Sequence, residues 1–299
     1  MREYIPLQKE PEKQIKFMTY NVWSRDDIAV YRRMEDIGGC VKKHQPDVIF
    51  FQEFTPYILR IFQSFSWWKE YHCSPISLEE RKGKSFCIML SKVPMENHAR
   101  WKFTTTATCK SYLEADISPG LGLGSATTMK PIRIATTQLE PPCPPESVRC
   151  MERYTQAEHS VAALSSAENV VFGGDMSWDD KMDLPFPLAA GWVDASRELR
   201  SPSQYSWTYD SFWAEKIGEF NGYTAPASEM KKRSDRFVCK LQDYTPKAIE
   251  LIEDKGLGIS YTKKYKTYNL EKVELMRSCH RGLVLTIVPN EPDISTLFD

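Results

Sequence analysis

Residues 169–177 read NVVFGGDMS, an apolar run that ends in two glycines and a carboxylate. Short runs of β-branched and aromatic residues are typical of buried strands, so a strand is predicted over Asn169–Asp175. A carboxylate at the end of such a strand is held rigidly at a rim, where ligand sites tend to form in α/β sheets. This stretch therefore predicts a buried sheet and places Asp175 at its functional edge.

Other runs of the same kind extend the strand pattern along the chain. They are Ile15–Val22, Asp47–Glu53, Phe86–Ser91, Ser111–Ile117, Ile132–Leu139, Asp235–Leu241, Ala248–Ile252 and Leu283–Val288. Apolar residues at helical spacing predict helices over Ile28–His44 and Glu146–Ala167, with a third over Tyr57–Ser66. Several strand pairs are too close in sequence for a helical crossover, so much of the pairing is expected to be antiparallel. The mixture predicts one α/β domain.

The composition sets the broad class of protein. A chain of 299 residues with 41% apolar content is long enough to bury a large core. We predict a polar leader or linker over 1–14, which could also be the end part of a longer natural chain, one domain over 15–290 and a C-terminal tail over 291–299. The formal charge of −1, from 39 basic and 40 acidic side chains, gives no global positive field, so any phosphate site must be local.

Cysteine usage and hydropathy indicate the compartment. The eight cysteines form no CxxC pair or Cys/His cluster, and the N-terminal residues contain no apolar segment of the secretory type. We therefore expect reduced thiols and an intracellular protein of the nucleus, the cytoplasm or both, not a secreted one. No apolar run approaches the roughly 18 residues that a membrane span needs. The oligomeric state is not indicated.

Polar residues lie at the ends of the predicted strands or just before them. They are Asn21, Glu53, Asp175, Asp235 and His280. Taken singly, each is more often a turn residue or a structural histidine than a functional residue. Taken together, Asn21 and Glu53 offer the amide and carboxylate oxygens that Mg²⁺ prefers when a substrate phosphate completes its shell. Attack of water on a phosphodiester also needs a base and a cationic donor, which Asp175 and His280 would supply.

Five ordered motifs carry a family resemblance. They are TYN at 19–21, FQE at 51–53, GGDM at 173–176, SDRF at 234–237 and SCHRGL at 278–283. Over roughly Lys16 to Val288 the chain resembles the endonuclease/exonuclease/phosphatase superfamily, whose fold is DNase I-like. TTQLE at 136–140, Glu152-Arg153 and YSWTYD at 205–210 look most like the tyrosyl-DNA phosphodiesterase 2 group, which releases a tyrosine left on a DNA 5′-phosphate.

The resemblance implies a fold and a set of roles. The fold would be a two-sheet α/β/β/α sandwich with mixed, largely antiparallel sheets and outer helices. Asn21 would contact metal or phosphate, Glu53 would bind Mg²⁺ or Mn²⁺, and Asp175 would activate water. His280 would bind the scissile phosphate, and Asp235 would fix the orientation of its ring.

Three residues depart from the family pattern, and they put activity in question. Cys279 stands where the family has aspartate, Ser177 where it has asparagine, and Gln138 where it has histidine. Removing one transition-state donor costs about 10²-fold or more in rate. We still expect Ser177 and Gln138 to bind substrate, together with Arg153 and with Trp207, which is equally compatible with a buried aromatic.

The leading hypothesis is a metal-dependent phosphodiesterase of DNA repair that hydrolyses 5′-phosphotyrosyl-DNA or related ends of single-stranded or 5′-end DNA. One alternative is the same chemistry on RNA, inositol phosphates or phospholipids, because the core does not select the leaving group. Another is a degenerate, non-catalytic binder of phosphate or nucleic acid. Basic residues at 231–233 and 263–266 would suit nucleic acid, or would simply be solvated surface.

Overall fold

The computed structural model describes residues 13–82, 85–106, 108, 110–120, 129–142, 149–201, 204, 206–210, 231–253, 255–264 and 270–291. Its helices and strands are β1 (Ile15–Asn21), α1 (Val30–His44), β2 (Val48–Phe54), α2 (Pro56–Gln63), η1 (Ser66–Glu70), β3 (His72–Cys73), α3 (Leu78–Lys82), β4 (Phe86–Ser91), β5 (Met95–Lys102), β6 (Ser111–Ile117), β7 (Ile132–Gln138), α4 (Cys150–Leu164), β8 (Asn169–Asp175), β9 (Trp192–Asp194), α5 (Ala195–Leu199), β10 (Tyr209–Asp210), β11 (Lys231–Lys232), β12 (Asp235–Leu241), β13 (Tyr244–Leu251), β14 (Gly256–Lys264), β15 (Leu270–Met276) and β16 (Leu283–Pro289). The predicted leader and tail lie almost wholly outside these residues and stay predictions.

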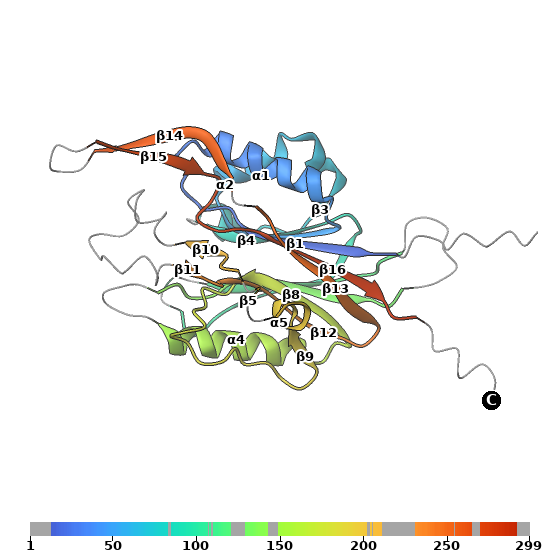
Figure 1. The fold of residues 1–299 in the computed structure, drawn as a ribbon. Coiled ribbons are helices and arrows are strands. Elements are labelled where there is room, and N and C mark those ends of the chain that lie inside the picture. The colour runs from blue at the N-terminus through green and yellow to red at the C-terminus, as the bar shows by residue number, and fades with distance from the viewer. Residues whose placement is uncertain are drawn as a thin grey trace, which may run out of the picture.

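Two six-stranded sheets lie face to face, with α1 and α2 on one outer face and α4 on the other (Figure 1). The first sheet has the order β13-β16-β1-β2-β4-β3, and the second has the order β5-β6-β7-β8-β12-β9. Each sheet contains one parallel pair, β1 with β2 and β7 with β8, and its other described pairs are antiparallel. Helices α1 and α4 make the crossovers that parallel pairs need. The predicted two-sheet sandwich is confirmed.

The core lies in three layers that explain the apolar strands. One cluster fills the space between the sheets, a second joins the first sheet to α1 and α2, and a third joins the second sheet to α4. Strand β8 is buried at all of its positions because Val171 faces the other sheet while Val170 and Phe172 face α4. A strand covered on both faces shows a continuous apolar run instead of alternation.

The structure adds strands that the sequence pattern did not predict. Strand β5 at one edge has no buried residue, so it lacks an apolar signal, and β14 and β15 form a separate hairpin. Strand β13 begins at Tyr244, earlier than the predicted Ala248. Pro246 is tolerated there because β13 is an edge strand with a bulge between Pro246 and Ala248. No helix in the described ranges combines the length and apolar character that crossing a bilayer requires.

Candidate active site

Strand directions bring the polar strand ends to one edge. Parallel pairing of β1 with β2 places Asn21 beside Gln52, next to Glu53, and parallel pairing of β7 with β8 places Gln138 beside Asp175. Strand β12 runs the other way, so its first residue, Asp235, lies opposite Asp175. Strand β16 is antiparallel to β1, so its starting end, preceded by His280, reaches the same edge. Residues from both sheets thus meet at one site.

Asp175 is the centre of this cluster. Its Oδ2 accepts hydrogen bonds from Asn21 Nδ2 at 2.9 Å and from Gln138 Nε2 at 3.2 Å. Its Oδ1 accepts from the Ser234 hydroxyl at 2.8 Å and from the Ser177 backbone N–H at 2.8 Å. Burial opposes ionisation, but the charge on His280 and these donors outweigh it and lower the pKa of Asp175 below its usual value. Asp175 is therefore an ionised carboxylate that can accept a proton.

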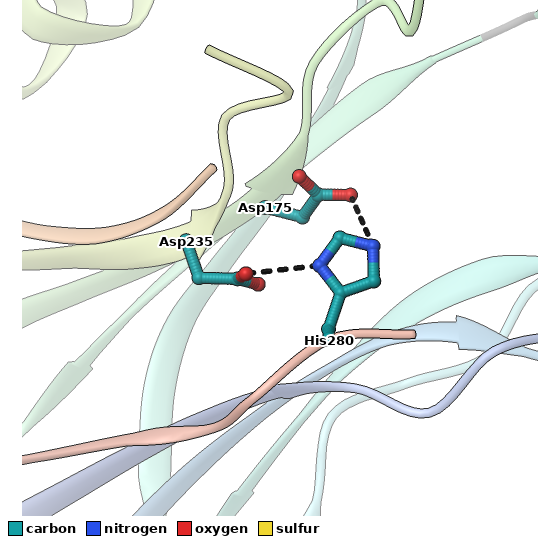
Figure 2. Close-up of side chains that lie close together, drawn as sticks. All are labelled: Asp175, Asp235 and His280. Atoms are coloured by element: carbon teal, nitrogen blue, oxygen red, sulfur yellow. Dashed lines mark hydrogen bonds and ion pairs between the residues drawn. The ribbon is translucent and has the colours of Figure 1, made fainter. Parts of the chain in front are cut away.

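His280 lies between two carboxylates (Figure 2). Its Nδ1 is 2.9 Å from Asp235 Oδ2, and its Nε2 is 3.8 Å from Asp175 Oδ2. Burial opposes protonation of the ring, but Asp235 and Asp175 outweigh it and raise the pKa of His280 to about 9. Burial raises the pKa of Asp235 to about 6, although the charge on His280 acts against that rise. Between these values the pair is imidazolium and carboxylate.

The His280 ring is also fixed by its surroundings. The Tyr209 ring packs against it with 4.7 Å between ring centroids. The backbone N–H of Asp235 donates to Thr208 Oγ1 at 2.8 Å, and Asp235 Oδ1 has no hydrogen-bond partner among the described residues. The orientation of Asp235 toward His280 is therefore set by the bond of its Oδ2 to His280 and by its backbone.

Glu53 is a half-buried carboxylate on a distorted strand. Its backbone is left-handed, with φ of 60°, and the register of β2 shifts between Phe51 and Phe54. Such bulges re-aim a side chain and store strain at functional sites. Burial would raise the pKa of Glu53, but the charges of Lys110 and His280 and the backbone N–H of Ser24 lower it overall. Glu53 is therefore ionised.

The oxygens of Glu53 suit a hard divalent cation. Oε1 accepts from Asn21 Nδ2 at 3.1 Å and Gln138 Nε2 at 2.7 Å, while Oε2 accepts from the Ser24 N–H at 3.0 Å and hydroxyl at 3.1 Å. One ionised carboxylate at a rim, completed by substrate oxygens and water, is a donor set that Mg²⁺ takes. The oxygens of Glu53 therefore fit Mg²⁺ or Mn²⁺. An ion bound at Oε1 would displace one of the two amide N–H groups, from Asn21 or Gln138, that bond this oxygen.

A second group of possible metal ligands is Asp175, Asp235 and His280, whose ligand atoms lie within 4.8 Å of one another. All three are buried, and His280 and Asp235 already bond each other. Cys279, which stands where the family pattern has aspartate, packs in an apolar cluster with Trp23 and Ile28. Both groups offer carboxylate oxygens to a cation, and the half-buried Glu53 is more accessible than the three buried residues.

The remaining predicted site residues differ in position. Ser177 holds Asp175 through its N–H, and its hydroxyl donates to the Leu139 carbonyl at 3.3 Å. Trp207 is half-buried, with Lys231 Nζ 4.7 Å from its ring centroid and the guanidinium carbon of Arg281, which follows His280, 4.8 Å from it.

Arg153 is not brought to the cluster. It is buried in α4, where its Nη2 binds Asp183 at 2.6 Å and its Nη1 donates to the Glu140 carbonyl at 3.2 Å. Its guanidinium therefore ties α4 to neighbouring loops.

The basic segment at 231–233 is largely neutralised by acidic neighbours. Lys232 lies 3.4 Å from Asp179, and Arg233 bonds Asp180 at 3.1 Å and Asp194 at 2.8 Å. The side chains at 263–266 lie outside the described residues. These contacts support a structural role for Arg233 in preference to a nucleic-acid role.

The other residues that contact the cluster differ in how strongly the sequence marks them. Ser234 is part of the SDRF motif, so its place beside Asp235 marked it. Lys110 and Ser24 lie outside the helices and strands, and the sequence contains no spacing that singles them out. Both contact the cluster, Lys110 through Gln138 and Ser24 through Glu53.

Comparisons with known proteins identify the family. Residues 18–240 match the model of the Endonuclease/Exonuclease/phosphatase family, and no curated protein sequence matches the chain. The structure resembles D. rerio TDP2 complexed with single strand DNA product, with 19% identity, a TM-score of 0.66 and coverage of 92% of this chain and 99% of that one. It also resembles C. elegans TDP2, with 18% identity, a TM-score of 0.68 and coverage of 92% and 75%.

A third similar structure is the human Nocturnin catalytic domain with bound sulfate anion, with 14% identity, a TM-score of 0.60 and coverage of 93% of this chain and 94% of that one. At these identities the likeness concerns the fold, and the family model, which matches most of the chain, concerns the sequence itself. The predicted resemblance to the superfamily is confirmed. The chain belongs to the Endonuclease/Exonuclease/phosphatase family.

Proposed function

We propose that the protein is a metal-dependent phosphodiesterase that hydrolyses 5′-phosphotyrosyl-DNA linkages or related DNA-end phosphodiesters by attack of water. One observation carries the proposal. The Asp235–His280 ion pair faces the ionised Asp175 across 3.8 Å, at the same sheet edge as Glu53. Family membership and the fold are compatible with this chemistry.

Each residue of the cluster has a defined part in the reaction. Asp175 accepts a proton from the attacking water as its oxygen bonds to phosphorus and the bond to the leaving oxygen breaks. The protonated His280 donates its Nε2–H to a phosphate oxygen, and Asp235 keeps the ring charged and oriented. Asn21 bonds both Glu53 and Asp175 and so fixes their separation. A cation held by Glu53 would neutralise charge on the phosphate and the leaving oxygen.

The choice of a DNA end rests on the aromatic and basic groups beside the site. Trp207 lies close to Lys231 and Arg281, and Arg281 adjoins His280. Aromatic rings with neighbouring cations suit the bases and phosphates of single-stranded nucleic acid. The similar D. rerio TDP2 was crystallised with a single strand DNA product, which supports the same class of substrate here.

The test is a panel of phosphodiesters assayed with Mg²⁺, with Mn²⁺ and with a chelator. The panel contains a 5′-tyrosyl oligonucleotide, an RNA, an inositol phosphate diester and a phospholipid. We expect metal-dependent release of tyrosine and a loss of about 10²-fold or more in Glu53→Gln and in His280→Ala. The exposed His72→Ala serves as the matched control and should retain full activity.

Three outcomes are distinguished by this panel. Cleavage of only a non-tyrosyl diester would show the substrate class to be wrong while leaving the mechanism intact. Binding of oligonucleotide without turnover of any diester would support the non-catalytic binder and overturn the proposal. Turnover that survives in Glu53→Gln and ignores the chelator would contradict the metal role of Glu53.

A further inference from the structure

Lys110 is fixed beside the active site at the start of β6. Its backbone N–H donates to Thr106 Oγ1 at 2.9 Å, and its carbonyl accepts from the Phe103 N–H at 3.1 Å. Its half-buried side chain places Nζ 2.6 Å from Gln138 Oε1. Pairing of Tyr112 with Thr137 in neighbouring strands explains why Lys110 and Gln138 meet. This lysine is therefore held in place and does not extend freely into water.

The Gln138 amide is bound at both of its ends. Its Oε1 faces the ammonium group of Lys110, while its Nε2 donates to Glu53 Oε1 at 2.7 Å and to Asp175 Oδ2 at 3.2 Å. Rotating the amide by half a turn would set its oxygen against two carboxylates and its NH₂ group against a cation. Lys110 and the two carboxylates therefore select the same orientation of an amide that has no such preference by itself.

The ammonium group also strengthens the amide as a donor. A hydrogen bond to a charged group is about twice as strong as a neutral one, and bonds in a chain polarise one another. The Gln138 N–H groups therefore face the space between Glu53 and Asp175 with more positive character than an isolated amide has. Groups that donate hydrogen bonds to a phosphate oxygen in the transition state need this polarity and this fixed geometry.

We propose that Lys110 is a positioning residue that acts through Gln138, fixing the amide so that one of its N–H groups, which donate here to Glu53 and Asp175, exchanges that bond for an oxygen of the reacting phosphate. The inference rests on the proposed function, because it assigns the amide to the same phosphate. The pair gives the site a cation-backed donor on strand β7, at the side of Asp175 opposite Ser234 and β12. Lys110 itself touches Gln138 and does not touch the substrate.

The first experiment is a double-mutant cycle with Lys110→Met, Gln138→Ala and the double variant. Steady-state kinetics use the diester that the wild-type protein cleaves. We expect Lys110→Met to lower kcat by roughly 10- to 100-fold with a smaller change in KM, and Lys110→Arg to restore most of that loss. In the Gln138→Ala background the same Lys110→Met change should cost less than about threefold, because its target is gone.

The matched control is Lys92→Met, which removes another partly buried lysine that lies 3.6 Å from Asp47, away from the cluster. It should leave kcat unchanged. Equal effects of Lys110→Met with and without Gln138, or equal effects of Lys110→Met and Lys92→Met, would overturn the proposal. Thermal melts report whether each variant is folded. If Lys110→Met is not folded, Lys110→Arg is used to test the contact between residue 110 and Gln138.

A binding measurement separates this inference from the proposed function. A 5′-phosphorylated single-stranded oligonucleotide is titrated in the presence of chelator, so no turnover is required. We expect Lys110→Met to weaken its affinity by about tenfold in the wild-type background and not in the Gln138→Ala background. If the wild-type protein cleaves no diester but shows this coupling, the proposed function is wrong and the role of Lys110 is supported. A protein without the coupling fails the inference whatever its activity.

Discussion

The charge of His280 depends strongly on its neighbours. Burial alone would favour the neutral ring, and the two adjacent carboxylates reverse that preference and raise its pKa to about 9. The ring therefore carries its proton throughout the neutral range, which is the form that the proposed mechanism requires as a donor. Asp175 stays ionised beside the charged ring because its pKa is lowered, so it remains available as the proposed base.

The first prediction concerns the alkaline limb of the pH profile. Activity should fall as pH rises through about 9, because His280 loses its proton there. In Asp235→Asn the largest favourable charge is removed while burial remains, so the limb should move to lower pH. The profile of kcat/KM measures the shift, and His72→Ala should leave the limb in place. If the alkaline limb is unchanged in Asp235→Asn, His280 is not the group whose titration lowers kcat/KM.

Stability should follow the same group. The folded protein binds the His280 proton more tightly than the unfolded chain, whose histidine has a pKa of 6.5. The stabilisation is therefore complete below that value and is lost as pH rises through about 9. Urea unfolding at several pH values should show the decline in the wild-type protein and a smaller decline in Asp235→Asn.

Sequence reasoning located site residues where a strand end marked them. Apolar runs lead directly to Asn21, Glu53 and Asp175. Their position at the edge of a sheet could therefore be predicted from the sequence. Lys110 has no such mark, because its role comes from the pairing of β6 with β7. Arg153 was predicted to bind substrate, but the face of α4 that carries it meets Asp183. Helical spacing does not say which partner a buried arginine will find.

At the scale of elements, the parallel pair β7–β8 depends on the absence of a side chain at Gly174. A Cβ atom there would meet the backbone carbonyl of Thr137 in the neighbouring strand. The preceding Gly173 is similarly closed by the rings of Phe237 and Phe50. The glycine pair therefore lets β8 approach both β7 and the opposite sheet, and this approach places Asp175 beside Gln138.

The second prediction tests this close approach. Gly174→Ala should lower the free energy of unfolding by about 1 to 3 kcal/mol through overpacking. Gly39→Ala in α1 is the matched control, since nothing lies within 4 Å of the added Cβ. It should be neutral or stabilising by up to about 1 kcal/mol, because alanine favours a helix. Urea titration gives both values, and equal values for the two variants would contradict the packing argument.

Strand β12 is anchored by a buried charge network on both sides of Asp235. Arg233 and Arg236 each bond Asp180 and Asp194, with distances from 2.8 to 3.1 Å. Arg236 and Asp194 are almost completely buried. The network ties β12 to β9 and to the loop after β8, so it holds the frame in which Asp235 meets His280.

The third prediction is that Asp194→Asn destabilises the protein by about 3 kcal/mol, since two buried guanidinium groups lose a shared counter-charge. Asparagine keeps the helix cap that Asp194 provides to Ser196, so the charge is the main change. The exposed Asp27→Asn, which removes a pair with Arg25, should cost less than about 1 kcal/mol. Denaturant unfolding measures the loss of unfolding free energy in both variants. Similar losses would mean that burial of the ion pair does not determine the destabilisation.

Elements with an apolar face were predictable, and polar edge strands were not. The buried strands β1, β2, β8 and β12 coincide with predicted runs to within one residue. Strand β5 is read from its hydrogen bonds with β6 and has no apolar pattern of its own. Its existence follows from the neighbour that it pairs with, which no local window of sequence contains.

At the scale of the whole molecule, the near-zero net charge limits how nucleic acid can bind. The basic side chains number 39 against 40 acidic ones, and much of the basic segment at 231–233 is paired internally. Attraction to phosphates must then come from the few cations around the site. Long-range steering of a DNA strand by the protein as a whole is not expected.

The fourth prediction is a shallow salt dependence of binding to the 5′-phosphorylated oligonucleotide. Each neutralised phosphate of a single strand contributes a slope of about −0.7 in log K against log salt, so two or three contacts give a slope of about −1.4 to −2.1. Arg32→Ala, in an exposed pair with Glu35 on α1, should not change that slope. Affinities measured over a salt series decide the matter, and a slope steeper than about −4 would indicate an extended basic surface.

The α/β class was predictable from the mixture of runs, but the meeting of the two sheets at one edge was not. It depends on the directions of β1 against β2 and of β7 against β8, which sequence patterns do not encode. The family resemblance supplied that information because it brings a known arrangement with it. Apolar periodicity alone gives the strands and leaves their order open.

The order of strands in the first sheet has a consequence for how the chain is made. Strands β5 to β9 and β12 of the second sheet come from one continuous stretch, whereas the first sheet needs β16 to lie between β1 and β13. On the ribosome, β1 must therefore wait unpaired on that side while more than two hundred residues are translated, since Ile15 pairs with Ile287. A nascent chain released early would lack both this covering strand and His280, so truncated products should be inert towards phosphodiesters and open to proteolysis.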